Sequence, residues 1–192
     1  GMERWFEPMH ASTVATAAID ELRVGYQGAL LEPLRTNVIL RSEEWDLAPW
    51  NTYGAPVDPP TVTPNAATAP DGTLTADQLD IPAVGSGGAS VIGQVSLSAP
   101  SDGAVTWSAW TQAVSGGSLT YLYGWDLTAG AYLGAELCFP LVVWTRCALP
   151  MLVTAGHSYN VRLGTDATPG SGMDPTDAIS LYAWGGQVEE GL

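Results

Sequence analysis

The side chains in this sequence that are best suited to chemistry are aromatic rings that also carry a polar atom. The chain contains 8 Trp and 7 Tyr but only 2 Phe, a balance typical of surfaces that are apolar and hydrated at once. Sugars present apolar C–H faces ringed by hydroxyl groups, so their sites combine aromatic platforms with amide, carboxylate or guanidinium groups at the edges. The candidate ligand-binding residues with these properties are Trp110, Gln112, Tyr121, Tyr123, Trp125, Asn160 and Arg162.

Strand alternation indicates how these candidates are presented. In segment 105–112 the side chains alternate between an apolar face that includes Trp107 and a more polar face that carries Trp110. In segment 119–126 three candidate rings fall on one face, and two interpretations of them stay open. The rings either fill the core of a sandwich or line a concave face, near the candidates in segment 159–163.

The sequence offers no arrangement typical of an enzyme. His10 and His157 lie in an N-terminal leader and in a predicted turn, far from any evident partner. There is no Gly-x-Ser-x-Gly elbow, phosphate-binding glycine loop or His-Glu-x-x-His pattern. A glycosidase needs only two carboxylates at a suitable separation, but no pair stands out among the 20 Asp and Glu. We therefore predict a protein without enzymatic activity.

Length and composition restrict the remaining function classes. At 192 residues the chain suits one compact domain. Its net charge of -14 repels phosphate backbones and argues against nucleic acid as a partner. Only 14% of the residues are charged and 46% are hydrophobic, the opposite of a disordered acidic chain. The 22 Gly and 14 Pro indicate many turns between short strands, and hence an all-β protein.

The domain from residue 34 to residue 192 is predicted to be an antiparallel β-sandwich. Its strands are expected at 34–40, 74–81, 89–97, 105–114, 119–126, 132–139, 142–149, 159–163 and 179–188. Turn signals such as Ser115-Gly116-Gly117 divide them, and the Pro- and Gly-rich segment 49–70 is expected to interrupt the sheets. Short strands with regular turn signals and almost no helix are typical of this fold class.

Residues 2–33 precede the sandwich and are predicted to form an arm or one short helix. The segment Ser12–Leu22 offers an N-cap residue and apolar positions at helical spacing. Gly1 resembles an expression remnant before a native Met2, and neither a secretory signal nor an apolar run of about 18 residues occurs. We therefore expect synthesis in the bacterial cytoplasm without a signal peptide, and no membrane span.

The two cysteines, Cys138 and Cys147, lie in predicted strands joined near Pro140. A cross-strand disulfide and two buried free thiols both fit this placement. The missing secretory signal favours the free thiols. Without two more cysteines or clustered histidines, the pair does not indicate a zinc site.

Several segments, taken in order, resemble a family of bacteriophage tail-protein domains that looks like a carbohydrate-binding jelly roll. The matching segments are 28–46 with Trp50 just after it, 68–79, Trp107-Ser108-Ala109-Trp110, Trp144-Thr145-Arg146 and 181–191. The first and last are the most specific. Within them, Ala69-Pro70-Asp71-Gly72 has the residues of a tight turn, and Gly185-Gly186 permits a bulge or a close backbone approach. These motifs mostly specify the scaffold.

The resemblance implies a jelly-roll fold and a role in the tail of a phage or prophage. In that role the protein would be a virion component that binds a polysaccharide or glycan on the host surface through exposed aromatic rings. Other tail subunits, or further copies of the same chain, are expected as partners. The alternative is a purely structural tail component that mediates subunit assembly without a ligand.

The resemblance also implies a cofactor. Related-looking jelly-roll modules hold a structural calcium ion where the first strand meets the last, with carboxylate and backbone oxygens as ligands. Here Glu44 or Asp46, after the first predicted strand, and Asp177, before the last, are the expected metal ligands. The alternative is that these are exposed loop carboxylates of an acidic protein.

Overall fold

The structure is a computed structural model that describes residues 23–25, 28–30, 37–85, 87–99, 101–115, 119–167 and 178–190. Its strands, in chain order, are β1 (Arg23–Gly25), β2 (Gly28–Leu30), β3 (Trp50–Ala55), β4 (Thr61–Ala67), β5 (Ala76–Ile81), β6 (Ala89–Ser98), β7 (Gly103–Ala113), β8 (Thr120–Asp126), β9 (Ala131–Cys138), β10 (Thr145–Val153), β11 (Ser158–Asp166) and β12 (Ile179–Glu190). The described residues contain no helix, and so none that is long and apolar enough to cross a membrane.

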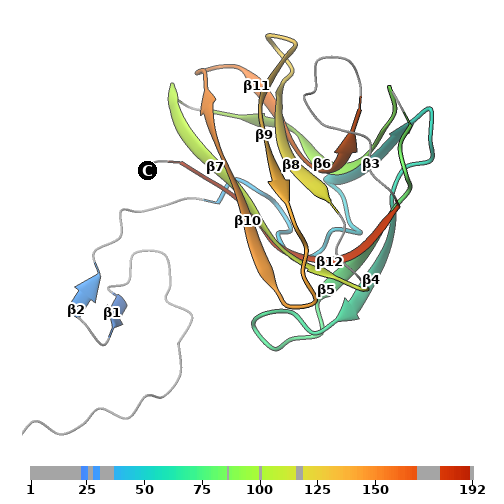
Figure 1. Cartoon of the computed structure of the whole chain (residues 1–192). Coiled ribbons are helices and arrows are strands. Elements are labelled where there is room, and N and C mark those ends of the chain that lie inside the picture. The colour runs from blue at the N-terminus through green and yellow to red at the C-terminus, as the bar shows by residue number, and fades with distance from the viewer. Residues whose placement is uncertain are drawn as a thin grey trace, which may run out of the picture. The chain divides into compact units, whose positions relative to one another are not determined.

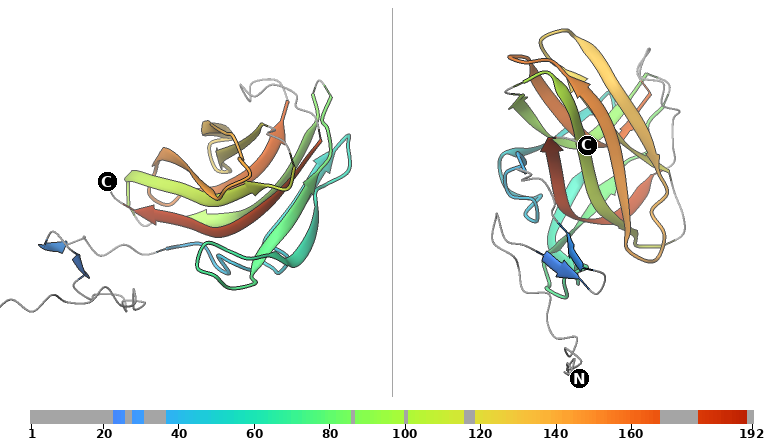
Figure 2. Two further views of the ribbon diagram at one scale, coloured as in Figure 1. Left: turned by 60° about the horizontal axis from the view of Figure 1, so that its bottom comes forward. Right: turned by 90° about the vertical axis from the view of Figure 1, so that its left-hand side faces the viewer.

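The chain divides into two units, Gly1–Arg35 and Thr36–Leu192. In the first, β1 and β2 form an antiparallel ladder; the predicted helix Ser12–Leu22 lies outside the described residues. In the second, two five-stranded antiparallel sheets pack face to face (Figure 1, Figure 2). The strand order is β10-β7-β12-β5-β4 in one, named the β7 sheet, and β3-β6-β11-β8-β9 in the other, named the β11 sheet. The predicted all-β sandwich is therefore confirmed.

Three tryptophan indoles lie in the core between the sheets. Trp45 and Trp50 stack with ring centroids 4.1 Å apart, and Trp107 packs 6.3 and 6.2 Å from them. Each indole N–H donates to a backbone carbonyl oxygen, at distances of 3.1, 2.8 and 3.2 Å. Because each indole N–H keeps a hydrogen bond, burying these large rings costs little free energy of desolvation. The alternation that predicted Trp107 inside the core and Trp110 outside it is confirmed.

Gly185 and Gly186, for which the sequence left open a bulge or a close backbone approach, form a bulge within β12. The register between β12 and β7 shifts between Trp184 and Gln187, and Gly185 has a φ of 62°, a value that side chains other than glycine rarely adopt. A Cβ atom on Gly186 would lie 3.0 Å from the ring of Trp50. The bulge therefore lets β12 pass close to the buried indole.

The segment 49–70, which was predicted to interrupt the sheets, instead contains β3 and β4. Both are edge strands, where proline is tolerated because its missing N–H can face away from the ladder. Pro64 lies within β4, where the register with β5 shifts between Thr63 and Ala67. The prolines therefore mark the edges of the two sheets.

The predicted strand 34–40 is wrong over the part that is described, where it contributes one isolated bridge between Asn37 and Glu189. The side chain of Asn37 makes two hydrogen bonds to the backbone of β12, where a strand would form a backbone ladder. Its Nδ2 donates to the carbonyl oxygen of Gly186 at 3.2 Å, and its Oδ1 accepts the N–H of Val188 at 3.0 Å. The backbone N–H of Val38 also donates to the carbonyl oxygen of Val188 at 3.0 Å. Of the apolar residues here, Ile39 is buried and Leu40 is exposed, so the apolar run marks a packed segment rather than a strand.

Cys138 of β9 and Cys147 of β10 form a disulfide, with Cα atoms 5.9 Å apart. The preference for two free thiols is therefore wrong. β9 and β10 are edge strands of different sheets, and they contact each other. This contact brings the two Cα atoms within the range that a disulfide spans, and the bond joins the two layers at one side.

Candidate functional site

The candidate site is the outer face of the β11 sheet, named here the β11 face. Leu122, Val161 and Leu163 of this sheet lie in the core, so the residues that alternate with them point outward. The aromatic and charged residues that the strand registers place on this face are Tyr53, Tyr121, Tyr123, Trp125, Tyr132, Arg162 and Asp166. Four of the seven predicted ligand residues are among them.

One cross-strand row on this face has tyrosines at both ends and small residues between them. Tyr53 of β3 pairs with Val91 of β6. Val91 also pairs with Gly164 of β11, which pairs with Tyr121 of β8. Neighbouring strands lie about 4.8 Å apart, so the row is roughly 14 Å long. Gly164 has a φ of 145°, and a Cβ atom there would lie 2.3 Å from the carbonyl oxygen of Ser90. Because only glycine fits at position 164, the one side chain between the two tyrosines of this row is that of Val91, which is buried.

Aromatic rings pack together on the part of the face formed by β8 and β9. Tyr132 lies edge-on to Trp125 with ring centroids 4.7 Å apart, and its centroid is 6.0 Å from that of Tyr123. The Tyr132 hydroxyl donates to Oδ2 of Asp166 at 2.7 Å, so its ring extends across Tyr123. Tyr121 packs against the same cluster. The rings of Tyr121, Trp125 and Tyr132 remain partly exposed and present an apolar surface.

Tyr123 is fully buried beneath this surface, and the Cζ atom of Arg162 lies 5.7 Å from the centroid of its ring. Within the described part of the chain, the Tyr123 hydroxyl has no hydrogen-bond partner of suitable geometry. Burial raises the pKa of this hydroxyl, and the positive charge of Arg162 only partly opposes the shift. Tyr123 is therefore neutral at ordinary pH and supports the rings around it.

Asn160 lies beside Trp125 in the register, but its side chain is used within the sheet. It is 3% exposed, and its Oδ1 accepts the backbone N–H of Ser96 at 3.2 Å. Ser96 has a φ of 62° and lies where the register between β11 and β6 shifts. The amide of Asn160 thus satisfies a backbone donor at a strand irregularity, and this contact is structural.

Trp110 and Gln112, the other two predicted ligand residues, lie on the outer face of the β7 sheet, named here the β7 face. Trp110 pairs with Arg146 in the register, and the Cζ atom of Arg146 lies 5.9 Å from the centroid of its ring. Arg146 also donates to the side-chain oxygen of Gln187. Gln112 donates its side-chain N–H to the carbonyl oxygen of Val142 at 2.7 Å. The structure thus divides the predicted ligand residues between opposite sides of the sandwich, and one site cannot contain both groups.

Tyr53, Tyr132 and Asp166 belong to the β11 face but are missing from the predicted set. Tyr132 pairs with Trp125 across the β8–β9 hairpin, a partner that the turn signal at 128–130 and strand alternation together indicate. Asp166 lies beyond the predicted end of its strand, and Tyr53 lies in the segment predicted to be irregular. Alternation could therefore have found Tyr132 but neither of the other two.

The predicted calcium ligands do not meet in a described metal site. Glu44 is exposed and pairs with Arg41 through a contact of 2.8 Å, and Asp46 is exposed. Asp177 lies outside the described residues. Across the described ranges, no group of three or more His, Cys, Asp or Glu side chains is suited to hold a metal ion. The calcium ion stays a prediction, which the change in melting temperature on chelation tests.

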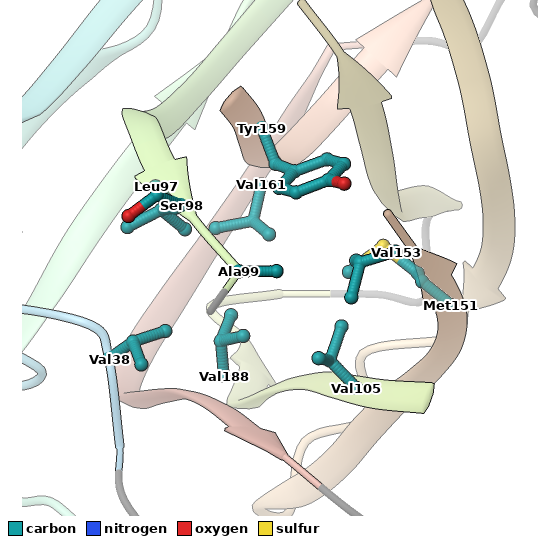
Figure 3. A pocket seen from close by; sticks show the side chains of 10 residues that line it. All are labelled: Val38, Leu97, Ser98, Ala99, Val105, Met151, Val153, Tyr159, Val161 and Val188. Atoms are coloured by element: carbon teal, nitrogen blue, oxygen red, sulfur yellow. The ribbon is translucent and has the colours of Figure 1, made fainter. Parts of the chain in front are cut away.

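A small cavity lies between the two sheets (Figure 3). Apolar side chains dominate its lining, among them Val105, Met151, Tyr159 and Val188. Its volume is about 20 Å³, enough for about one water molecule, whereas ligand pockets usually measure about 300 to 1,000 Å³. The cavity belongs to the core and is too small for a sugar.

Comparison with known proteins yields a fold and no family. No family model matches the chain, and no curated protein matches it either. The carbohydrate-binding module TmCBM61, solved in complex with β-1,4-galactotriose, is similar with a TM-score of 0.54 and 13% identity, over 81% of this chain and 99% of that one. The enzymatically active domain of tailspike protein 4 from bacteriophage CBA120 is similar with a TM-score of 0.52 and 14% identity, over 79% of this chain and 21% of that one. This chain thus spans about a fifth of the tailspike structure. Both likenesses show the jelly-roll sandwich.

Proposed function

We propose that the protein is a glycan-binding module that uses the β11 face and catalyses no reaction there. The observation that carries this proposal is the cluster of partly exposed rings of Tyr121, Trp125 and Tyr132, next to Arg162. Such rings stack on the apolar C–H face of a sugar, and a guanidinium group donates to its hydroxyl oxygens. Tyr53, which is 55% exposed at the far edge of the sheet, would contact a later sugar of a chain that crosses the strands.

The fold likeness supports an oligosaccharide or polysaccharide as the ligand class. TmCBM61, which shares the fold, was solved with β-1,4-galactotriose. That protein shows that a sandwich of this kind can accommodate a short sugar chain. In this protein the row from Tyr53 to Tyr121, roughly 14 Å long, is long enough to contact more than one sugar residue.

We further propose that the glycan belongs to a bacterial host surface and that the protein acts in a phage or prophage tail. The segments 28–46 and 181–191 resemble phage tail-protein domains. The likeness to part of a bacteriophage CBA120 tailspike structure supports the same context. In this proposal the protein is a virion component, and other tail subunits are its partners.

The distribution of carboxylates supports binding without catalysis. Over the described strands, the registers place one carboxylate on the β11 face, that of Asp166. It accepts a hydrogen bond from Tyr132. Most glycoside hydrolases use a pair of carboxylates about 5 to 10 Å apart, and the described strands place no such pair on this face.

Calorimetric titration against a panel of bacterial surface polysaccharides and β-linked oligosaccharides tests the proposal. We expect Trp125→Ala and Tyr121→Ala each to weaken binding about 10-fold or more, which corresponds to roughly 1.4 kcal/mol. Trp110→Ala, on the β7 face, is the matched control and should leave the affinity unchanged. Absence of binding across the panel, or an equal loss in the control variant, would contradict the proposal.

Assembly of a tail without a ligand is the second candidate function. It is favoured by large apolar side chains that are exposed in the loop between β9 and β10. Contacts between subunits commonly bury such groups. A chain that assembles but binds no member of the glycan panel would favour this function over the first.

A further inference from the structure

One end of the sandwich carries a patch of exposed apolar side chains, named here the apolar end. Their exposed fractions range from 36% for Leu119 to 67% for Val142. Two of them flank the β7–β8 connection and four lie in the β9–β10 loop. The members are Val114, Leu119, Phe139, Leu141, Val142 and Val143.

The backbone of the β9–β10 loop is held in place while its side chains face solvent. The carbonyl oxygen of Leu141 accepts the N–H of Ala113 at 2.7 Å, and that of Val142 accepts the side-chain N–H of Gln112 at 2.7 Å. The disulfide between Cys138 and Cys147 closes the base of the loop. These polar contacts use the loop's backbone groups and leave its apolar side chains uncovered.

The β8–β9 ladder continues the patch onto the neighbouring connection. Thr120 pairs with Cys138, which places Leu119 next to Phe139. Val114 directly follows Ala113, whose N–H donates to the carbonyl oxygen of Leu141 in the β9–β10 loop. The two connections that carry the six exposed side chains therefore lie next to each other.

The chain segments that carry the six side chains contain no charged residue, although the chain as a whole is strongly acidic. Segments 113–115, 119–125 and 139–145 contain no Asp, Glu, Lys or Arg, although the net charge of the chain is -14. Two copies that meet through these segments therefore bring none of the segments' own side chains into charge repulsion; the carboxylate of Asp80 lies nearby, where it accepts a hydrogen bond from Ser180 beside Val114. Exposed charges farther from the contact are screened over about 8 Å at physiological salt.

The size of the patch matches one side of a protein interface. With roughly 150 to 200 Å² for a fully exposed large apolar side chain, the exposed parts of the six members amount to roughly 500 Å². A standard interface buries about 800 Å² on each partner, of which about 56 to 65% is apolar. The apolar area that each partner contributes to such an interface is therefore close to the exposed area of the six side chains.

We propose that the apolar end is the contact between two copies of this chain, related by a twofold axis. A twofold contact joins the same surface on both partners, so apolar side chains would meet apolar side chains. The six side chains of the patch are all uncharged, so none of them selects a partner by charge. Because it lies at the strand ends, both β11 faces stay uncovered in the dimer.

Sedimentation equilibrium of the full chain over a wide concentration range tests this proposal. We expect twice the chain mass of 20.1 kDa for the wild type. Val142→Asp places a carboxylate at the centre of the contact and should weaken association about 100-fold or more. Leu152→Asp is the matched control: Leu152 is 76% exposed on β10, outside the apolar end, and this variant should remain a dimer.

Several outcomes would overturn the proposal. A wild type of 20.1 kDa at every concentration would do so, as would a trimer or a larger assembly. Dimerisation of Val142→Asp with wild-type affinity, or equal dissociation of the control, would place the contact elsewhere. Thermal melts verify that each variant is folded, and Val143→Asp replaces Val142→Asp if the latter is not. Glycan binding is not needed for any of these results, so this test and that of the β11 face can fail independently.

Discussion

Both outer faces of the sandwich carry tryptophan and tyrosine, but they hold these rings differently. On the β7 face each indole has its own polar neighbour: Arg146 covers Trp110, and the N–H of Trp184 donates to Oγ1 of Thr75 at 3.0 Å. On the β11 face the rings of β8 and β9 pack on one another, with centroids 4.7 and 6.0 Å apart. One face is a set of separate polar contacts and the other is a continuous aromatic surface.

This difference teaches that exposed tryptophan alone does not define a binding face. The β7 face uses its amide and guanidinium groups internally, since Gln112 binds a loop carbonyl and Arg146 binds Gln187. On the β11 face Arg162 lies against the ring of Tyr123, and a guanidinium group has five N–H donors. Arg162 therefore keeps donors for a ligand, next to rings on which a sugar can stack.

The largest expected effect comes from filling the middle of the β11 face. Gly164→Ala adds a Cβ atom 2.3 Å from the backbone oxygen of Ser90, at a φ of 145°. We expect a loss of about 3 kcal/mol or more in the free energy of unfolding, measured in urea. Gly103→Ala is the control, because a Cβ atom there meets nothing within 4 Å. Equal stability of the two variants would show that the β11 face tolerates a side chain at this position.

A smaller effect is expected from the hydroxyl groups of two tyrosines on the β11 face. Tyr132→Phe removes a donor from the buried carboxylate of Asp166 and should cost about 1 to 3 kcal/mol. Tyr123→Phe removes a hydroxyl with no hydrogen bond of suitable geometry within the described part of the chain, although Arg162 lies close to it, so it should cost less than Tyr132→Phe. Thermal melts of both variants measure the difference. A larger loss in Tyr123→Phe than in Tyr132→Phe would reverse the roles assigned to the two residues.

Double-mutant cycles compare the ring contacts of the two faces directly. For Trp125 and Tyr132 we expect a coupling energy of about 0.5 to 1.5 kcal/mol, as for other edge-to-face pairs. For Trp110 and Arg146, which is exposed, we expect about 0.5 kcal/mol. Urea unfolding of the single and double alanine variants gives both values. A stronger coupling on the β7 face would contradict the distinction between the two surfaces.

The smallest expected effect is a pH dependence at the turn that follows Trp125. Asp126 accepts the N–H groups of Thr128 and Ala129 at 2.9 and 2.8 Å and contacts Nδ1 of His157 at 2.8 Å. Burial raises its pKa, but these hydrogen bonds and the charge of His157 together hold the pKa below the usual 3.8. The folded pKa is thus below the unfolded one.

The stabilisation from Asp126 should therefore be present above pH 3.8 and be lost as the pH falls through the folded pKa. Asp126→Asn removes the titrating group, so its melting temperature should fall less steeply in acid than that of the wild type. Thermal melts between about pH 2 and pH 6 measure both profiles. Parallel profiles would show that this turn makes no contribution to acid sensitivity.

Strand alternation was sufficient to place single residues relative to the core. It predicts Trp107 inside and Trp110 outside, as the structure has them. The glycine pair Gly185-Gly186 likewise indicates a bulge or a close backbone approach, and the structure has a bulge there. Both features depend on residues that are close in sequence, because side-chain direction and backbone conformation are set locally.

The division of the candidate residues between two faces could not be predicted in the same way. β7 and β8 follow each other in the chain but belong to different sheets, so Trp110 and Trp125 lie on opposite sides of the sandwich. The structural use of Asn160 depends on Ser96, 64 positions away. Sheet membership and such distant contacts follow from the packing of the whole domain, which a pattern within one segment does not contain.

The chain crosses between the two layers at both edges of the sandwich, from β3 to β4 on one side and from β9 to β10 on the other. The first crossing contains Pro56, Pro59 and Pro60, whose rings restrict φ even when the protein is denatured. The second is closed by the Cys138–Cys147 bond into a small ring. Both restrictions lower the conformational entropy of the denatured chain. Part of the free energy of unfolding of this domain therefore arises because its denatured state has fewer accessible conformations.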